Sequence, residues 1–418
     1  MEKEASPRGA RGVPGGEGPV TRSVARSLRV VRRLEPRVRA WAHLDERGAL
    51  ERAALADRRP AGPLTGVVVG VKDLVDTAGM PTSYGSAIYA DHRPSADADI
   101  VTLLGDAGGF VLGKTVTTEF ALMTPGPTRN PWRLTHTPGG SSSGSAAAVA
   151  CGMADVAVGT QTYGSLIRPA GFCGVWAFKP SRGRVPAGGV KPLAPSFDQV
   201  GWYAGSPALL VVVNRLVTGA PPVRSASSPP RLGFLDVSSW PGLEPEVPAS
   251  LARLREVVSL RGATVVDLDL SDLLLRTGEA HHTAASAEIA ESLRPELEHH
   301  RELLSAPLRD FLAEGAAVGA ADRDAAHAAL RELGAKLAAE LEAVDALLLP
   351  SATGEAPSGL ASTGDPVFCS PWTAVGFPAM NLPGAVGATR LPIGWQLVAG
   401  PDRDDALLRC ALWLAKRA

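Results

Sequence analysis

Residues 137–174 contain the pattern that most restricts the fold of this chain. They read TPGGSSSGSAAAVACGMADVAVGTQTYGSLIRPAGFCG, in which a glycine- and serine-rich loop precedes helix-forming alanines at 145–154 and a buried-strand pattern at 155–160. A second serine-bearing loop follows that strand directly. Because a helix and a strand that run out and back bring their flanking loops to one edge of a sheet, we expect Ser141 and Ser165 to lie close together.

Other segments show the same alternation of buried strands and helices. The run LTGVVVGVKDLVD at 64–76 is rich in consecutive valines, which is typical of a strand covered on both faces. A helix is indicated at 99–108, and a short buried strand, GFVLGKT, at 109–115. This rhythm predicts α/β layers in which at least part of the sheet is parallel.

The N-terminal region divides into two parts. Residues 1–20 combine glycine, proline and charge, and we expect a disordered tail because this composition buries too little surface to offset the entropy cost of ordering. Between 21 and 57, apolar positions recur at helical spacing among arginines, as at Val24, Leu28 and Val31. Two amphipathic surface helices are predicted there.

The second half of the chain predicts a helical region followed by a return to strands. Residues 221–232 are rich in proline and serine and are typical of a surface connection. The stretch 272–345 is rich in alanine, leucine, glutamate and arginine, which favour helices. A buried strand is predicted at 344–354, and residues 391–418 indicate a strand, a turn and a closing helix.

The composition is that of a globular protein without a strongly charged partner. Hydrophobic residues make up 45% of the 418 residues and charged residues 20%, and the formal net charge is −1, so neither nucleic acid nor an anionic membrane is expected as a partner. The four cysteines lie far apart, and we predict no metal site. Without an apolar secretory signal or a membrane-spanning run, we expect a cytoplasmic protein.

Lys72 ends the valine-rich run, at a position otherwise suited to burial. Burial disfavours the ammonium form and lowers the pKa of a lysine, which can turn it into a general base near neutral pH. The alternative is that Lys72 lies at the exposed end of the strand and pairs with Asp73 or Asp76. The lysine by itself leaves both interpretations open.

The serine-rich loop is compatible with several kinds of site. A phosphate-binding Walker A loop is disfavoured, because GxxxxGK[ST] requires a lysine that does not follow. GSSSG at 140–144 matches the GxSxG of a nucleophile elbow around Ser142, but that elbow needs a preceding strand, and NPWRLTHTPG is a proline-containing loop. A serine–histidine site would depend on His136, which we interpret as a loop residue.

Together these segments resemble the amidase signature family, whose core reads GGSSxGSAAAVAxG, then GTxTxGS, then PAxFCG. The matching residues here are 139–152, 159–165 and 169–174. The resemblance extends to GPLTGVVVGVKDLVDTAGMPTSYGS, VLGKTVTTEFA, PTRNPW, APSFDQVGWYAGS, VGFPAMNLP and LPIGWQLVAGP. It therefore covers nearly the whole chain apart from the tail and the helical stretch between the 270s and the 340s.

The resemblance implies an α/β fold with a central mixed β-sheet flanked by helices on both faces. We expect a single domain at 21–418. Its core would comprise 60–220 and 344–418, and a variable helical substrate lobe would lie at about 221–343.

The resemblance also implies a Ser-Ser-Lys triad. By position, Ser165 matches the nucleophile, Ser141 the bridging serine beside a cis peptide bond, and Lys72 the base. Backbone N–H groups would form an oxyanion hole for the tetrahedral intermediate. The residues that supply them are Thr162, Tyr163, Gly164 and Ser165. This chemistry needs neither a metal nor a cofactor.

Three positions depart from the commonest family pattern. Gln161 stands where Asp is frequent and Ile167 where Arg is frequent, but Gln161 together with Arg168 and Pro169 fits a subgroup that reads GTQTxGSxIRPA. Tyr163 stands where the family usually has glycine or alanine, and a bulky side chain resists a positive φ. Its phenol either lines the acyl pocket or points away into a gap.

Further residues are expected beside the triad. Ser142 would bond the loop backbone, and Thr160 would support the bridging serine. The full set expected beside the triad or in the substrate pocket is Ser142, Thr160, Gln161, Arg168 and Met123. In the helical stretch, His281 and His282 are interpreted as a solvated helix face rather than a metal site.

The expected activity is hydrolysis of a small-molecule carboxylic amide, other than a peptide bond, through an acyl-enzyme on Ser165. One alternative is transfer of the acyl group to an amine, as in a biosynthetic amide-forming enzyme or one component of an amidotransferase. The other is a non-catalytic scaffold, which only Tyr163 suggests. A homodimer is the assembly considered, since soluble enzymes are often symmetric dimers.

Overall fold

The computed structural model describes residues 18–237, 240 and 242–416. The helices are α1 (Pro19–Val38), α2 (Glu46–Ala56), α3 (Asp99–Asp106), α4 (Ser143–Ala150), α5 (Ile167–Cys173), α6 (Pro207–Thr218), α7 (Glu246–Leu260), α8 (Ser271–Ser292), α9 (Arg294–His299), α10 (Ala306–Ala317), α11 (Ala320–Leu341), α12 (Ser370–Ala374) and α13 (Asp404–Ala415), with short 3-10 turns at η1 (Ala87–Tyr89), η2 (Glu119–Ala121) and η3 (Arg301–Leu303). The strands are β1 (Trp41–Leu44), β2 (Val68–Lys72), β3 (Phe110–Thr115), β4 (Val156–Gln161), β5 (Trp176–Lys179), β6 (Gln199–Ala204), β7 (Arg231–Leu235), β8 (Thr264–Leu268), β9 (Ala346–Pro350), β10 (Ala379–Val386) and β11 (Pro392–Val398).

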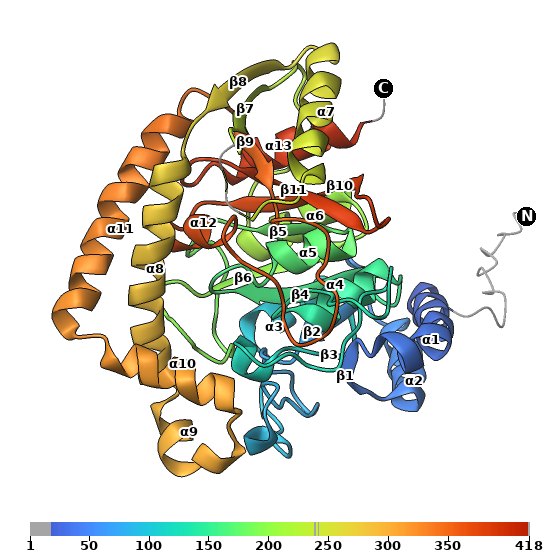
Figure 1. Ribbon diagram of the computed structural model, residues 1–418. Coiled ribbons are helices and arrows are strands. Elements are labelled where there is room, and N and C mark those ends of the chain that lie inside the picture. Colours follow the sequence, from blue (N-terminus) through green and yellow to red (C-terminus); the bar gives the residue numbers. More distant parts are fainter. Residues whose placement is uncertain (1–17, 238–239, 241, 417–418) are drawn as a thin grey trace, which may run out of the picture.

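A mixed sheet forms the centre of the molecule (Figure 1). Within the described ranges it has eleven strands in the order β1-β3-β2-β4-β6-β5-β10-β11-β9-β7-β8. The strand β2 is parallel to both of its neighbours, and so is β7, whereas the remaining pairs are antiparallel. The expected mixed sheet is therefore confirmed.

Helices cover both faces of the sheet. The helices α4 and α5 contact each other and pack on one face of the central strands. The helices α3, α6 and α13 form a second group on the other face, where α6 contacts both α3 and α13 (Figure 1). The helices expected near 99–108 and 145–154 and the strands expected near 109–115 and 155–160 are confirmed as α3, α4, β3 and β4. No helix in the described ranges is long and apolar enough to cross a membrane.

The N-terminal helices agree with the apolar spacing. In α1, Val20, Val24, Leu28 and Val31 are buried, so the predicted stripe faces the protein. Residues 1–17 of the predicted tail lie outside the described residues. The predicted end of the tail at residue 20 is wrong, because helix α1 already begins at Pro19. The sequence also did not reveal the short strand β1 between the two helices, which adds to the edge of the sheet.

The helical lobe is shorter than expected. Residues 231–268, within the stretch assigned to that lobe, supply β7 and β8 to the sheet, with α7 between them. The strand β8 is a half-exposed edge strand and therefore lacks the continuous apolar pattern of a central strand. The helices α8 and α11 lie side by side beyond one end of the sheet, with α10 packed against α8 (Figure 1).

The helix α4 approaches its neighbours closely because its residues are small. Gly144 has no room for a side chain: a Cβ there would lie 2.2 Å from the Ala40 carbonyl oxygen and 2.3 Å from the Val116 nitrogen. Both contacts are with backbone, which cannot rotate away. The glycine therefore fixes how deeply the loop at 137–142 sits against the sheet.

Substitution of Gly144 by alanine should destabilise the protein by roughly 1–3 kcal/mol, the usual cost of overpacking. Urea denaturation followed by circular dichroism would measure the change. Gly105→Ala is the matched control, because Gly105 is an exposed residue of α3 with nothing within 4 Å of its would-be Cβ. That variant should be neutral or slightly stabilised. Equal stability of the two variants would contradict this account of α4.

Candidate active site

Lys72 ends β2 with its side chain fully buried. Its Nζ lies 2.8 Å from Ser141 Oγ and 2.7 Å from Thr160 Oγ1. Burial lowers the pKa of the Lys72 amine well below its usual value, and the charge of Asp198 acts in the opposite direction. The interpretation of Lys72 as an exposed strand-end residue is therefore wrong.

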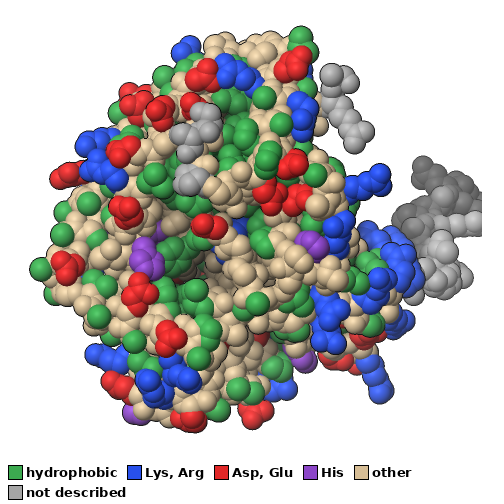
Figure 2. Space-filling model, in the orientation of Figure 1, with side chains coloured by type: hydrophobic (Ala, Val, Ile, Leu, Met, Phe, Trp, Pro, Cys, Tyr) green, Lys and Arg blue, Asp and Glu red, His purple; other side chains and the backbone are tan. Residues whose placement is uncertain are grey.

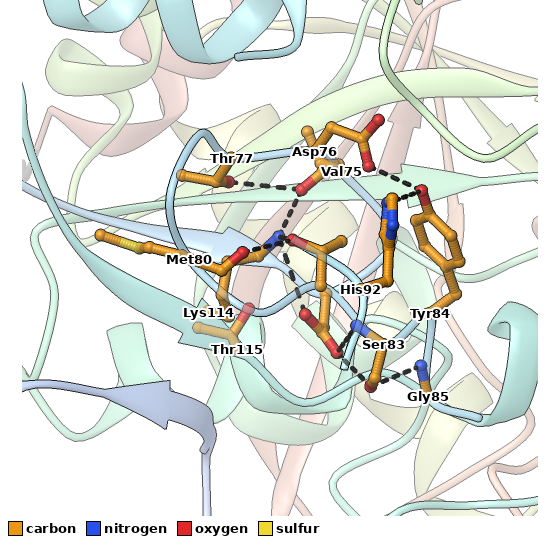
Figure 3. A network of polar contacts seen from close by, with 12 residues as sticks. Val75, Asp76, Thr77, Met80, Ser83, Tyr84, Gly85, His92, Lys114 and Thr115 are labelled. Carbon is orange, nitrogen blue, oxygen red and sulfur yellow. Dashed lines mark hydrogen bonds and ion pairs between the residues drawn. The ribbon is translucent and has the colours of Figure 1, made fainter. Parts of the chain in front are cut away.

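The carboxylates after Lys72 have other partners. Asp73 accepts hydrogen bonds from the backbone N–H and hydroxyl of Ser83 and lies 3.7 Å from the buried amine of Lys114. Asp76 accepts a hydrogen bond of 2.7 Å from the Tyr84 hydroxyl. Figure 3 shows Ser83, Tyr84 and Lys114 around the turn that follows β2, with Asp76 bonded to the Tyr84 hydroxyl. This network leaves Lys72 without a carboxylate partner among the described residues.

The loop that carries Ser141 is fixed by backbone contacts. The peptide bond between Gly140 and Ser141 is cis. The Gly140 carbonyl accepts a hydrogen bond of 2.8 Å from the buried guanidinium of Arg168, which also donates to Thr363 Oγ1 at 3.0 Å. Arg168 thus joins the serine-rich loop to the segment near Thr363, which the sequence did not connect to the site.

Ser142 bonds the backbone of Thr160 through its hydroxyl, which makes no hydrogen bond to Lys72 or Ser165. Its hydroxyl donates to the Thr160 carbonyl at 3.2 Å and accepts from the Thr160 N–H at 3.3 Å. Its own N–H donates to the Ser165 carbonyl at 3.2 Å, which ties the two serine loops together. Thr160 contacts Lys72, so it supports the amine rather than the bridging serine directly.

The loop that carries Ser165 is held from both ends. The side-chain oxygen of Gln161 accepts from the N–H groups of Leu166 and Ile167 at 2.8 and 2.9 Å, and its Nε2 donates to Thr373 Oγ1 at 2.9 Å. These bonds require the amide of Gln161, because a carboxylate could not donate to a hydroxyl. The Thr373 hydroxyl donates to the Tyr163 carbonyl at 2.7 Å.

The backbone N–H groups of this loop remain available. Within the described part of the chain, none of the N–H groups of the four residues expected in the oxyanion hole donates a hydrogen bond. Thr162 is positioned through its hydroxyl, which donates to Asp198 at 2.6 Å. Asp198 also accepts from the N–H groups of Leu193 and Ala194, and burial raises the pKa of its carboxyl to about 6.

Tyr163 does not strain the loop. The φ angle of Tyr163 is not positive, so its side chain does not clash with the backbone in the way that a bulky residue in the left-handed region would. Its ring packs against His281 of α8 with a centroid distance of 4.7 Å, and its hydroxyl is buried without a hydrogen-bond partner. Tyr163 also lines a pocket that contains Ser165. Of the two alternatives for the phenol, the structure therefore supports the one in which the ring lines the pocket.

His281 is not part of a solvated helix face. It is fully buried, its Nδ1 lies 2.7 Å from Ser370 Oγ, and burial lowers its pKa to about 3. Its ring lies between those of Tyr163 and Phe197, at centroid distances of 4.7 and 4.6 Å. His282 remains exposed and pairs with Glu314 at 2.9 Å. Among the described residues, no group of three or more His, Cys, Asp or Glu is placed to hold a metal ion.

Both serines open onto one pocket of about 870 Å³. It lies between α8, α10, the serine loops and the segment 361–367, and Met123 is part of its wall. The Ser165 hydroxyl makes no hydrogen bond within the described residues, and Ser165 lines the pocket although only 8% of the residue is exposed. His136 does not line this pocket, and its ring contacts the Thr135 hydroxyl instead.

The family model for amidases matches residues 22–408. This chain belongs to the amidase signature family. It is 30% identical to a glutamyl-tRNA(Gln) amidotransferase subunit from Desulfosudis oleivorans, over 93% of this chain and 91% of that protein. A crystal structure of an amidase superposes with a TM-score of 0.87 at 30% identity over 95% of both chains. A peptide amidase bound to the competitive inhibitor chymostatin superposes with a TM-score of 0.80 at 28% identity, over 94% and 93% of the two chains.

Three parts of this amidase-signature site were missed from the sequence. Asp198 lies in the recognised motif APSFDQVGWYAGS, which could have signalled a role, but nothing in the motif places it beside Thr162. Ser370 and the segment 361–367 come from a region without a readable pattern. They reach the pocket only because α12 and α8 are packed together.

The contact between Tyr163 and His281 can be tested by stability measurements. Tyr163→Phe should change the free energy of unfolding by less than about 1 kcal/mol, because the hydroxyl it removes has no partner. Tyr163→Ala should cost roughly 2–4 kcal/mol, because it leaves a cavity beside His281. Urea denaturation of both variants measures the difference. If the two variants were equally stable, the ring would not hold the loop against α8.

Proposed function

We propose that this chain is an amide hydrolase that forms an acyl-enzyme on Ser165. The observation that carries the proposal is the 2.8 Å contact between the buried Lys72 amine and Ser141 Oγ, beside a pocket that also contains Ser165. A nucleophilic serine needs a neighbouring base, and the base must be neutral to accept a proton. The lowered pKa of Lys72 supports that role.

The first step is the attack of Ser165 on the amide carbonyl. A neutral lysine amine has one lone pair, so Lys72 can accept the Ser141 proton while it donates an N–H to Thr160 Oγ1. Ser141 in turn accepts the proton of Ser165 as the Ser165 oxygen bonds to the carbonyl carbon. The proton ends on Lys72, and the carbonyl oxygen becomes an oxyanion.

The second step releases the amine. The unoccupied N–H groups of the loop at 162–165 would stabilise the oxyanion, a contribution whose loss typically costs roughly 10²- to 10³-fold in rate. The proton held by Lys72 returns through Ser141 to the leaving nitrogen as the carbon–nitrogen bond breaks. Water then attacks the acyl-enzyme by the same relay, which yields the carboxylic acid and restores Ser165.

Transfer of the acyl group to an amine is the second candidate function. It is supported by the curated relatives, which are named as subunits of a glutamyl-tRNA(Gln) amidotransferase. In that case a nucleophilic amine would replace water in the final step of the same mechanism. The non-catalytic alternative has less support, since Tyr163 has no positive φ and the reason for expecting a damaged oxyanion hole is gone.

Replacement of Ser165 by alanine should abolish hydrolysis of every amide that the wild-type protein accepts, because it removes the oxygen that bonds to the carbonyl carbon in the proposed first step. A fluorophosphonate probe should label the wild-type protein and leave Ser165→Ala unlabelled, as read by intact-protein mass spectrometry. Ser259→Ala, on the exposed side of α7, is the control and should keep both properties. Undiminished activity of Ser165→Ala would overturn the proposal.

Burial lowers the pKa of Lys72, and the charge of Asp198 should partly offset this effect in the pH dependence of the reaction. The negative charge raises the pKa of Lys72, so Asp198→Asn lowers it and moves the rising limb of kcat/KM to lower pH. The shift applies above about pH 6, where Asp198 is ionised in the wild-type protein. Glu256→Gln is the matched control, because it removes one negative charge from an exposed position of α7 that does not line the pocket. An unchanged limb in Asp198→Asn would refute the assignment of Lys72 as the titrating base.

A further inference from the structure

The interior of the Ser165 pocket is largely apolar. Leu122, Leu274, Phe311 and Val367 contribute to its wall, and Met123 stands half-exposed at its edge. A cavity of about 870 Å³ with such a lining accommodates an aryl or alkyl group well beyond the scissile amide. Figure 2 shows the hollow on this face, with hydrophobic side chains inside it.

Carboxylates surround the mouth of the same pocket. Glu279 of α8, Glu314 of α10 and Asp365 of the segment 361–367 line the pocket, and all three are exposed. Acidic side chains are visible around the hollow in Figure 2. The three carboxylates come from separate elements, so they are not a charged face of a single helix.

The basic groups that line the pocket, Arg168 and His282, leave an excess of negative charge at the three carboxylates, although Asp365 attracts Arg168. Arg168 is buried, and its guanidinium is held by Gly140 and Thr363 at the base of the serine loop. His282 pairs with Glu314 at 2.9 Å, which leaves Glu279 and Asp365 without an ion pair among the described residues. A substrate carboxylate at the mouth would therefore face repulsion, whereas an ammonium group would be attracted.

The inner wall offers neutral polar groups. Tyr163 lines the pocket, and its hydroxyl is buried without a partner. Ser370 lines it as well, and its hydroxyl is held by His281 at 2.7 Å. The buried Tyr163 hydroxyl and the engaged Ser370 hydroxyl do not compensate a full charge on a substrate. A charged group on the substrate is therefore favoured only at the mouth.

We propose that the preferred substrate of this site is an amide with an apolar body and a protonated amine at the end remote from the scissile bond. The apolar body occupies the interior of the pocket, and the ammonium lies among Glu279, Glu314 and Asp365. The inference rests on the proposed function for the cleavage step, but the charge preference belongs to the pocket and is measurable by binding alone. Substrates whose remote end carries a carboxylate and no ammonium group fit this mouth poorly.

A series of matched amides tests the charge preference. The compounds are 3-phenylpropanamide and its para-aminomethyl and para-carboxyl derivatives, which share the scissile group and the apolar body. We expect kcat/KM to fall from the cationic to the neutral to the anionic amide, by roughly fivefold at each step, the effect of one charge pair near a protein surface. High salt should reduce the differences, because the carboxylates are exposed.

Glu279 is the best position for a variant, because its side chain has no hydrogen bond or ion pair in the described structure and its loss should not disturb the fold. Glu279→Gln should weaken the preference for the cationic amide, and Glu279→Lys should remove or reverse it. Glu256→Lys is the matched control, since Glu256 is an exposed residue of α7 and does not line the pocket. It carries the same change in net charge and should leave the order of the three amides intact.

Calorimetric titration of the three amides into Ser165→Ala separates this inference from the proposed function. Tighter binding of the cationic amide, lost in Ser165→Ala combined with Glu279→Lys, supports the charge preference whether or not the wild-type protein hydrolyses the compounds. Equal binding of all three amides, or tighter binding of the anionic one, overturns it. Absence of hydrolysis together with the expected order of binding would contradict only the proposed function.

Discussion

The site depends on one buried amine. Lys72 lies where three strands of the sheet are held together, and its Nζ contacts two hydroxyls and no carboxylate within the described residues. A lysine that is desolvated without a counter-ion favours its neutral form. The surrounding contacts maintain this condition, because Asp73 and Asp76 are engaged by Lys114, Ser83 and Tyr84 in the turn after β2.

The two serine loops form one rigid unit around that amine. The N–H of Ser142 donates to the Ser165 carbonyl, Arg168 binds the Gly140 carbonyl, and Gln161 holds the start of α5. Few of the side chains named here can rotate independently, because each is held by a backbone group or by a second side chain. Such preorganisation is what stabilises developing charge without reorganisation during the reaction.

The helical lobe contributes to the site through packing as well as through pocket walls. His281 of α8 is buried between Tyr163 of the nucleophile loop and Phe197, and it bonds Ser370 of α12. The unusual tyrosine and the buried histidine therefore form one contact between the sheet core and the lobe. Changes on α8 can reach the loop at 162–165 through this contact, although α8 supplies no group to the proposed relay.

From the sequence, the alternation of strands and helices predicts α/β layers, and the resemblance to the amidase signature family implies the mixed sheet and the grouping of Ser141, Ser165 and Lys72. Local patterns, such as the valine run before Lys72, the small residues of α4 and the spacing of the two serine loops, predict only the layers and the proximity of the loops. The sequence does not show whether Lys72 pairs with a carboxylate, because Asp73 is its neighbour along the chain. In the folded protein Asp73 faces Lys114 instead, so Lys72 lacks that partner. Only the tertiary structure decides this. The same holds for the edge strand β8, the burial of His281 and the carboxylates around the mouth. Each of these depends on which distant segments pack together, and a local pattern does not record that.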